Sequence, residues 1–240
     1  MTYMLPTKFN WSDERMRTTD AGVLDTLYTG DFNSKGKIGA YFEIGRHHFT
    51  DKIILVDNFD YGIAYKMFRG TEDFDGLMKL DSTVTPITNA GKFNESYISA
   101  HFNASNILQV MDKNFIMNSI GLNVDYKMFN SNTYPGPTTG MNIVYPNNLL
   151  VQMHYRLGFG FRLRPSLFVI PSIETPILNI VSFDDGKSTL QFFNSRYRPL
   201  IFSIRFLLLD KRKTRDCTGK SNGKTGHQLW DKKMGKKYKR

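Results

Sequence analysis

The sequence lacks the features that several classes of protein require. One cysteine among 240 residues excludes an intrachain disulfide, and a Cys/His zinc module lacks its ligands. The longest apolar runs, such as 53–56 and 206–209, fall well short of the roughly 18 consecutive apolar residues of a membrane helix. A disordered chain is excluded because 40% of the residues are hydrophobic and 14% aromatic. The chain is therefore either a soluble domain or a membrane β-barrel.

The formal net charge of +10 belongs almost entirely to the end of the chain. Positions 210–240 carry 12 Lys or Arg against three Asp, a net of +9, whereas positions 1–209 carry 20 basic and 19 acidic residues. This nearly neutral body gives no reason to expect a nucleic-acid groove. We expect three parts: a polar segment at 1–35 that is an outer loop or a weak first strand, a β-barrel at 36–209, and a basic tail at 210–240.

Apolar residues at every second position are the strongest pattern in the sequence. The clearest case runs from Leu149 to Leu163, and the intervening positions hold residues such as Gln152, His154 and Arg156. The pattern recurs at 116–128 and 200–208, and more weakly at 38–44, 59–67, 98–104 and 167–177. Successive side chains of a strand point to opposite faces of the sheet. The sequence therefore predicts seven clear strands, each with one apolar and one polar face.

The connections between these strands alternate in length. Short links at Thr50-Asp51, near 111–113 and at Arg164-Pro165 alternate with longer polar loops at 70–94, 130–148 and 183–195. Several aromatic residues near strand ends, including Phe49, Tyr65, Phe68 and Phe129, are typical of the aromatic girdles of a membrane barrel. These features predict an all-β, antiparallel up-and-down transmembrane β-barrel of about eight strands in an outer membrane. A soluble lipocalin-like barrel is the alternative.

Bacterial single-chain barrels have an even number of strands, so seven leaves one strand to be found. The N-terminus has no secretory signal peptide, which would be a basic stretch followed by about 7 to 15 apolar residues. Two interpretations remain open. The sequence begins inside a longer precursor, or residues 1–35 supply the eighth strand.

The polar faces of the predicted strands carry both acidic and basic residues. In a barrel of about eight strands they share a narrow interior that side chains fill. An isolated charge away from water is costly, so opposite charges there are expected to pair. The predicted network comprises Glu43, Asp60, Lys66, Asp125, Lys127, Arg156, Arg162, Glu174 and Arg205. We expect a filled, non-conducting barrel that holds no cofactor and no metal.

An enzymatic role is the alternative function, because some small outer-membrane barrels modify lipids with a Ser/His pair. The candidate residues are His47, His48, His101 and His154. None of them lies in a GxSxG, HExxH or paired-carboxylate pattern. We therefore expect a protein that is not an enzyme.

The basic tail begins where the alternation stops, after Leu209. By the order of the turns it emerges on the periplasmic side, where it is either a solvated segment or a docking segment for a periplasmic partner, anionic lipid or another subunit. Without a recognised reading module, nucleic-acid binding is not expected. The candidate partner-binding residues are Lys211, Arg212, Lys213, Leu229, Trp230, Lys236 and Lys237.

The strands Gly39-Ala40-Tyr41-Phe42-Glu43-Ile44-Gly45 and Tyr155-Arg156-Leu157-Gly158-Phe159-Gly160-Phe161, with a sequence rich in Asn, Lys, Tyr and Phe, resemble small outer-membrane β-barrel proteins of the Bacteroidota. That group includes PorT-like and PorG-like barrels associated with type IX secretion. The resemblance covers roughly positions 36–210, and the basic tail departs from the group's usual ending at the last strand. It implies an integral outer-membrane scaffold or accessory subunit that works without a cofactor.

Overall fold

The computed structural model describes residues 1–5, 11–18, 24–50, 55–80, 83–111, 113–131, 142–143, 148–164, 166–181, 191–192 and 199–209. All regular structure in these ranges is β-strand, and none of these residues belongs to a helix that could cross a membrane. The strands are β1 (Thr2–Met4), β2 (Trp11–Thr18), β3 (Leu24–Lys37), β4 (Tyr41–Phe49), β5 (Asn58–Leu80), β6 (Thr83–Met111), β7 (Asn114–Asn130), β8 (Asn142–Ile143), β9 (Leu149–Arg164), β10 (Leu167–Val181), β11 (Gln191–Phe192) and β12 (Pro199–Leu208).

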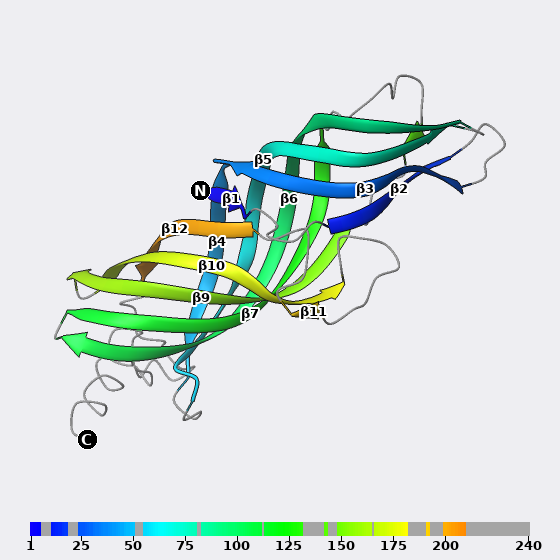
Figure 1. The fold of residues 1–240 in the computed structure, drawn as a ribbon. Helices are drawn as coiled ribbons and strands as arrows, with labels where there is room; N and C mark the ends of the chain where they lie inside the picture. Colours follow the sequence, from blue (N-terminus) through cyan, green and yellow to red (C-terminus); the bar gives the residue numbers. More distant parts are fainter. Residues whose placement is uncertain are drawn as a thin grey trace.

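The strands form one curved antiparallel sheet (Figure 1). Its order is β1-β12-β10-β9-β7-β6-β5-β3-β2-β8, while β4 also pairs with β5 and β11 with β10. β3 and β4 lie end to end along β5, with Lys37 opposite Arg69 and Tyr41 opposite Lys66. Four steps along β3 and β4 therefore match three along β5, which is the signature of a β-bulge. The strands β5, β6, β7, β9, β10 and β12 are neighbours in the sheet in the same order as in the sequence.

All seven strands predicted from alternation are present, as β4, β5, β6, β7, β9, β10 and β12. The expected total of about eight was wrong, because the described residues contain twelve strands. Three of the additional strands, β1, β2 and β3, begin within 1–35, and two short ones, β8 and β11, fall where loops were expected. Short or polar strands carry little apolar alternation, so this pattern could not reveal them.

The polar loop expected at 70–94 is instead a long hairpin. β5 and β6 pair without a break from Asn58 opposite Ser105 to Leu80 opposite Thr83. The upper half of this hairpin also pairs with β3, and in Figure 1 these strands extend beyond the other long strands at the upper right. Polar residues such as Asp73 and Asp75 interrupt the apolar alternation, so the sequence pattern did not predict a strand here. The strands still pair because backbone hydrogen bonds do not require apolar side chains.

The faces of the sheet are arranged as the alternation predicted. Asp125 and Arg156 are 0% and 1% exposed, whereas Phe42 and Ile120 are 72% and 54% exposed. Charged residues are almost never fully buried in soluble proteins unless they are paired. The sequence therefore buries its charges and exposes its aromatic and aliphatic side chains.

Two apolar clusters close the buried face at its two ends. Near the short turns, the first comprises Phe49, Ile107, Phe115, Met117, Phe168, Ile170 and Leu209. Toward the opposite end, the second comprises Met4, Phe68, Tyr97 and Leu150. Phe49 and Phe68 are thus buried, and their assignment to an outward aromatic girdle was wrong; Tyr65 and Phe129 are exposed. The buried Arg156 and Glu174 lie between these clusters, whereas Glu95 and Lys127 are level with the second, opposite Phe68 and Tyr97.

Candidate functional site

The centre of the buried face is organised around Arg156 of β9. Its Nε donates to Oε2 of Glu174 at 2.6 Å, and its Nη2 lies 2.5 Å from the same oxygen. Nη2 also donates to Oε2 of Glu43 at 3.3 Å. The guanidinium of β9 therefore links carboxylates from β10 and β4, two strands that do not pair with each other.

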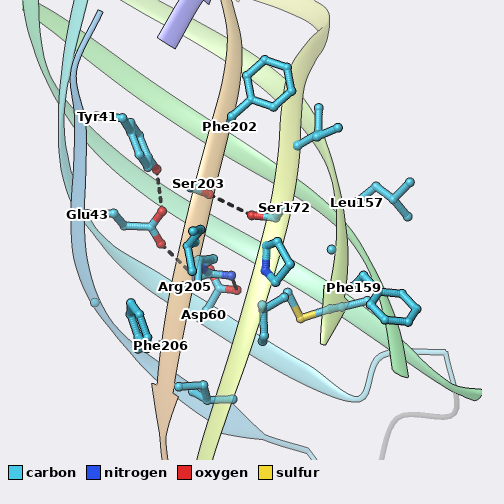
Figure 2. A pocket seen from close by; sticks show the side chains of 18 of the residues that line it. Tyr41, Glu43, Asp60, Leu157, Phe159, Ser172, Phe202, Ser203, Arg205 and Phe206 are labelled. Carbon is cyan, nitrogen blue, oxygen red and sulfur yellow. Dashed lines mark hydrogen bonds and ion pairs between the residues drawn. The ribbon is translucent and has the colours of Figure 1, made fainter. Parts of the chain in front are cut away.

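A second arginine, Arg205 of β12, also contacts Glu43 and adds a third carboxylate, Asp60 of β5. Its Nη2 lies 2.9 Å from Oε1 of Glu43 and 3.2 Å from Oδ1 of Asp60. His101 Nε2 lies 3.4 Å from Oε1 of Glu43. Figure 2 shows Glu43, Asp60 and Arg205 converging between β4 and β12.

Neutral groups donate further hydrogen bonds to the carboxylates of this cluster. The hydroxyl of Tyr41 donates to Glu43 at 2.5 Å, and the amide of Asn103 donates to Asp60 at 2.6 Å. Asn123 donates to Glu174 at 2.7 Å, and His154 Nδ1 lies 2.9 Å from the same carboxylate. Pairing of this kind is what allows charges to be buried without a large loss of stability, although Nη1 of Arg156 is buried without a hydrogen bond among the described residues.

Two further ion pairs lie toward the long-hairpin end. Lys66 donates to both carboxylate oxygens of Asp125, at 2.8 and 3.0 Å, and both side chains are 1% exposed. Lys127 lies 3.5 Å from Glu95, which also accepts from the Tyr97 hydroxyl at 2.6 Å. Charged pairs therefore continue along the buried face above the central cluster.

The structure brings five of the nine predicted network residues into this central cluster: Glu43, Asp60, Arg156, Glu174 and Arg205. Lys66 and Asp125 form a pair of their own, and Lys127 pairs with Glu95, which the sequence analysis did not single out. Arg162 lies outside these pairs, over the ring of Phe168 near the short turns. Sequence analysis also missed Tyr41. Glu95 lies two residues before Tyr97 and six before His101, so the alternation of β6 already placed it on the polar face.

Glu43, Asp60 and His101 each offer a ligand atom within 4.8 Å of the others. Both carboxylates, however, already face a guanidinium: Arg156 and Arg205 contact Glu43, and Arg205 contacts Asp60. The two guanidinium groups supply the positive charge that a divalent cation would otherwise bring. The arrangement is therefore that of an ion-pair network.

The four candidate histidines lie on β4, β6 and β9, in different surroundings. His154 and His101 are buried and face carboxylates, and neither bonds to a described serine. His47 packs edge-on against Phe49, and His48 is opposite Phe59 in the β4–β5 ladder. A Ser/His pair needs its two side chains within hydrogen-bond reach.

A cavity of about 1140 Å³ opens beside the network, between β4 and β12 (Figure 2). Its polar wall includes Tyr41, Glu43 and Arg205, while Phe42 and Phe206 contribute apolar surface. Ser172 and Ser203 hydrogen-bond at 2.8 Å across the neighbouring strands β10 and β12. The cavity therefore connects the charged interior with the apolar exterior.

The residues proposed to bind a partner, from Lys211 to Lys237, lie outside the described part of the chain. Comparisons with known proteins found no matching family model, no matching curated protein and no matching solved structure.

Proposed function

We propose that this protein is an integral outer-membrane β-barrel that acts as a non-enzymatic scaffold or accessory subunit, with its basic tail docking a periplasmic partner. The observation that carries the proposal is the reversed arrangement of the sheet, with ionic groups buried and apolar groups exposed. A lipid bilayer is the environment in which this arrangement is stable.

The exposed apolar residues are not gathered in one patch. They are spread over the seven strands that the alternation predicted, β4, β5, β6, β7, β9, β10 and β12. They include Phe42, Ile44, Ile63, Ile98, Phe102, Ile120, Leu122, Leu157, Phe159, Ile173, Phe202, Ile204 and Phe206. A monomeric soluble protein rarely exposes a contiguous apolar patch larger than a few hundred Å². A belt that runs from β4 through β12 is better explained by lipid than by a single protein partner.

Closure of the sheet into a barrel is supported by contacts between its edges. β1 pairs with β12, and Thr2 also exchanges two backbone hydrogen bonds with Gly39, which precedes β4. Lower down, Arg205 of β12 reaches Glu43 of β4. If β1 is counted together with the seven strands that the alternation predicted, the proposed barrel has eight strands around its wall. Bacterial barrels also have an even number.

The strands are long enough for both a membrane span and an exposed extension. A β-strand rises about 3.3 Å per residue, so the 29 residues of β6 span about 95 Å if straight, whereas crossing a bilayer takes about 9 to 11 residues. The part of the β5–β6 hairpin at residues 70–93 contains several Asp, Thr and Lys residues. It lies at the end of the sheet opposite the short turns. We assign this end to the cell exterior and the short turns to the periplasm.

The filled interior favours a scaffold over a channel. The two apolar clusters lie on either side of the central charged cluster along the buried face. The tail leaves β12 at the short-turn end with a net charge of +9, which suits an acidic periplasmic partner. A secretion-type assembly of the Bacteroidota outer membrane is the process to which the sequence resemblance points.

The membrane assignment can be tested with one substitution and a matched control. Ile120→Arg places a charge in the apolar belt and is expected to destabilise the full chain in lipid vesicles by about 2–4 kcal/mol. Thr85→Arg, on the exposed hairpin of the same sheet, is expected to change stability by less than about 0.5 kcal/mol. Equal, small effects in urea unfolding would show that no lipid contacts Ile120 and would refute the assignment.

The docking role is tested separately on the tail. The chain ending at Leu209 should insert into the outer membrane but lose proteins that co-purify with the full chain from cross-linked cells. A control in which the tail's Lys and Arg are changed to Gln keeps the length and removes the charge, and it should lose the same proteins. Unchanged co-purification with both variants would rule out docking by the basic tail.

A further inference from the structure

Seven strands follow one another across the sheet, in the order β4, β5, β6, β7, β9, β10 and β12. Each of them is antiparallel to its neighbour in this row. The six antiparallel steps reverse the direction an even number of times, so β4 and β12 run in the same direction. A barrel with an even number of strands closes with an antiparallel pair, whereas the two ends of this row meet as parallel strands.

β4 and β12 approach each other without pairing. Some of their Cα atoms lie within 8 Å of each other. Neighbouring strands are about 4.8 Å apart, so two strands with a third between them are about 9.6 Å apart, and β4 and β12 are too close for a further strand at this place. Among the residues that the structure describes, no backbone hydrogen bond joins β4 to β12. We call this contact of residues 41–49 with residues 202–208 the seam.

The seam is tied at its upper end by β1. Thr2 pairs with Ile201 of β12 and, on its other side, exchanges two backbone hydrogen bonds with Gly39, which precedes β4. Nearer the short turns, the ion pair of Arg205 with Glu43 joins β12 to β4. Backbone hydrogen bonds therefore tie the wall together at the level of β1, and a side-chain contact ties it below.

Arg205 is the clasp across the seam. Its Nη2 lies 2.9 Å from Oε1 of Glu43, and its Nη1 donates to Oδ2 of Asp60 at 3.2 Å. On the other side of β4, all nine residues of the strand pair with residues of β5. An ion pair that is partly exposed contributes less than a ladder of backbone hydrogen bonds. The seam is therefore the weakest line in the wall that the described strands form.

Movement of β12 away from β4 leaves the buried carboxylates with partners. Glu43 keeps the Tyr41 hydroxyl and Nη2 of Arg156, and Asp60 keeps the amide of Asn103. β12 itself stays paired with β10 along eight residues. Opening of the seam therefore costs mainly the contacts of the arginine clasp.

The cavity of about 1140 Å³ is lined by side chains from both faces of the wall. They include Glu43 and Ser172 from the inner face and Phe202 and Phe206 from the outer face (Figure 2). Unpaired backbone at membrane depth is tolerated where it is buried in protein or lines a water-filled cavity, and the facing edges of β4 and β12 lie beside this cavity. The two apolar clusters flank the charged cluster along the buried face, so the seam gives the ionic groups their direct way to the outside.

We propose that the seam is a lateral gate: β12 moves away from β4 and opens the central charged cluster toward the bilayer, and Arg205 holds the gate closed through Glu43 and Asp60. The proposal rests on the barrel of the proposed function and goes beyond it by assigning a movable line to the wall. β1 stays bonded to both sides, so the opening is confined to the part of the seam nearer the short turns. The open gate joins the ionic interior to the bilayer from the side.

The test measures distances between nitroxide labels by electron paramagnetic resonance, in the full chain carrying Cys217→Ser and inserted in lipid vesicles. The seam pair has labels at Phe42→Cys of β4 and Ile173→Cys of β10, on either side of β12. The control pair has labels at Phe42→Cys and Ile98→Cys of β6, on either side of β5. Phe42 is opposite Tyr65 and Tyr65 is opposite Ile98, so backbone ladders join the control pair throughout. All three labelled positions are exposed.

Arg205→Met is expected to raise the population of long distances in the seam pair about fivefold or more and to leave the control pair unchanged. Arg205→Lys, which keeps the charge, should raise it less. Glu43→Gln weakens the same clasp from β4 and should act in the same direction, which keeps the test open should Arg205→Met fail to insert. Unchanged seam distances in these variants, or equal broadening of both pairs, would overturn the proposal. Failure of the membrane assignment is recognised independently, because Ile120→Arg tests it in a chain with an unaltered seam.

Discussion

Arg156 provides the sharpest test of the buried network. It is 1% exposed, contacts Glu174 through two nitrogens and reaches Glu43 through one of them. Arg156→Met keeps an unbranched side chain of moderate length but removes the charge. Glu174 then keeps Asn123 and His154 as partners, yet no guanidinium. Breaking a buried pair in this way typically costs about 3–5 kcal/mol, and we expect Arg156→Met to fall in that range.

A double-mutant cycle separates the ion pair from the loss of packing. Glu174→Gln removes the negative charge while keeping an oxygen that can accept from Asn123. If the two charges stabilise each other, the double variant should be more stable than the sum of the single effects predicts, by about 2 kcal/mol or more. The measurement is urea unfolding of vesicle-inserted protein, in which the midpoint and the slope are compared between variants.

Arg162→Met is the matched control, since Arg162 lies on the same strand but over the ring of Phe168 rather than in the cluster. It is expected to cost clearly less than Arg156→Met. Additive single effects in the cycle, or an Arg156→Met cost below about 1 kcal/mol, would mean that the cluster does not stabilise the fold through paired charge. The argument for a filled barrel would then lose its electrostatic basis.

The remaining predictions concern the pair above the cluster and the packing below it. Lys66→Met should destabilise the protein by about 3 kcal/mol because Asp125 is fully buried opposite it, and adding Asp125→Asn should recover part of that loss in the same urea assay. Gly160→Leu should cost about 1–3 kcal/mol, since a Cβ there would lie 2.0 Å from the Phe115 ring, and Phe115→Ala should relieve the clash, as read by thermal unfolding of the single and double variants.

The fold was predictable where one face of a strand differs from the other. Strands such as β9 alternate strictly because their two faces meet different surroundings. In the upper half of the β5–β6 hairpin, polar residues such as Asp73 and Thr88 stand among the apolar ones. Its pairing depends on backbone hydrogen bonds, which leave no mark on the side-chain pattern. The three residues of β1 are too few to show any period.

The sequence predicted which face of the sheet the charged residues occupy, but not which of them are level with one another along neighbouring strands. Alternation placed Arg156 and Arg162 on the same side of β9, and the sequence analysis therefore assigned both to one network. Six residues of strand separate them by about 20 Å, which is farther than either side chain reaches. Which charges meet depends on how neighbouring strands are staggered, and that register is set by turns and bulges such as the one between Pro176 and Leu178.

The exposure of the charges changes across the central cluster. The side chain of Arg156 is 1% exposed, whereas that of Arg205, on the edge strand β12, is 19% exposed. Both contact Glu43, so the difference comes from what covers them: β9 has a paired strand on either side, and the lower half of β12 has one among the described strands. Arg205 therefore remains nearer to the surface than Arg156, because fewer described strands flank β12 than β9 at this level.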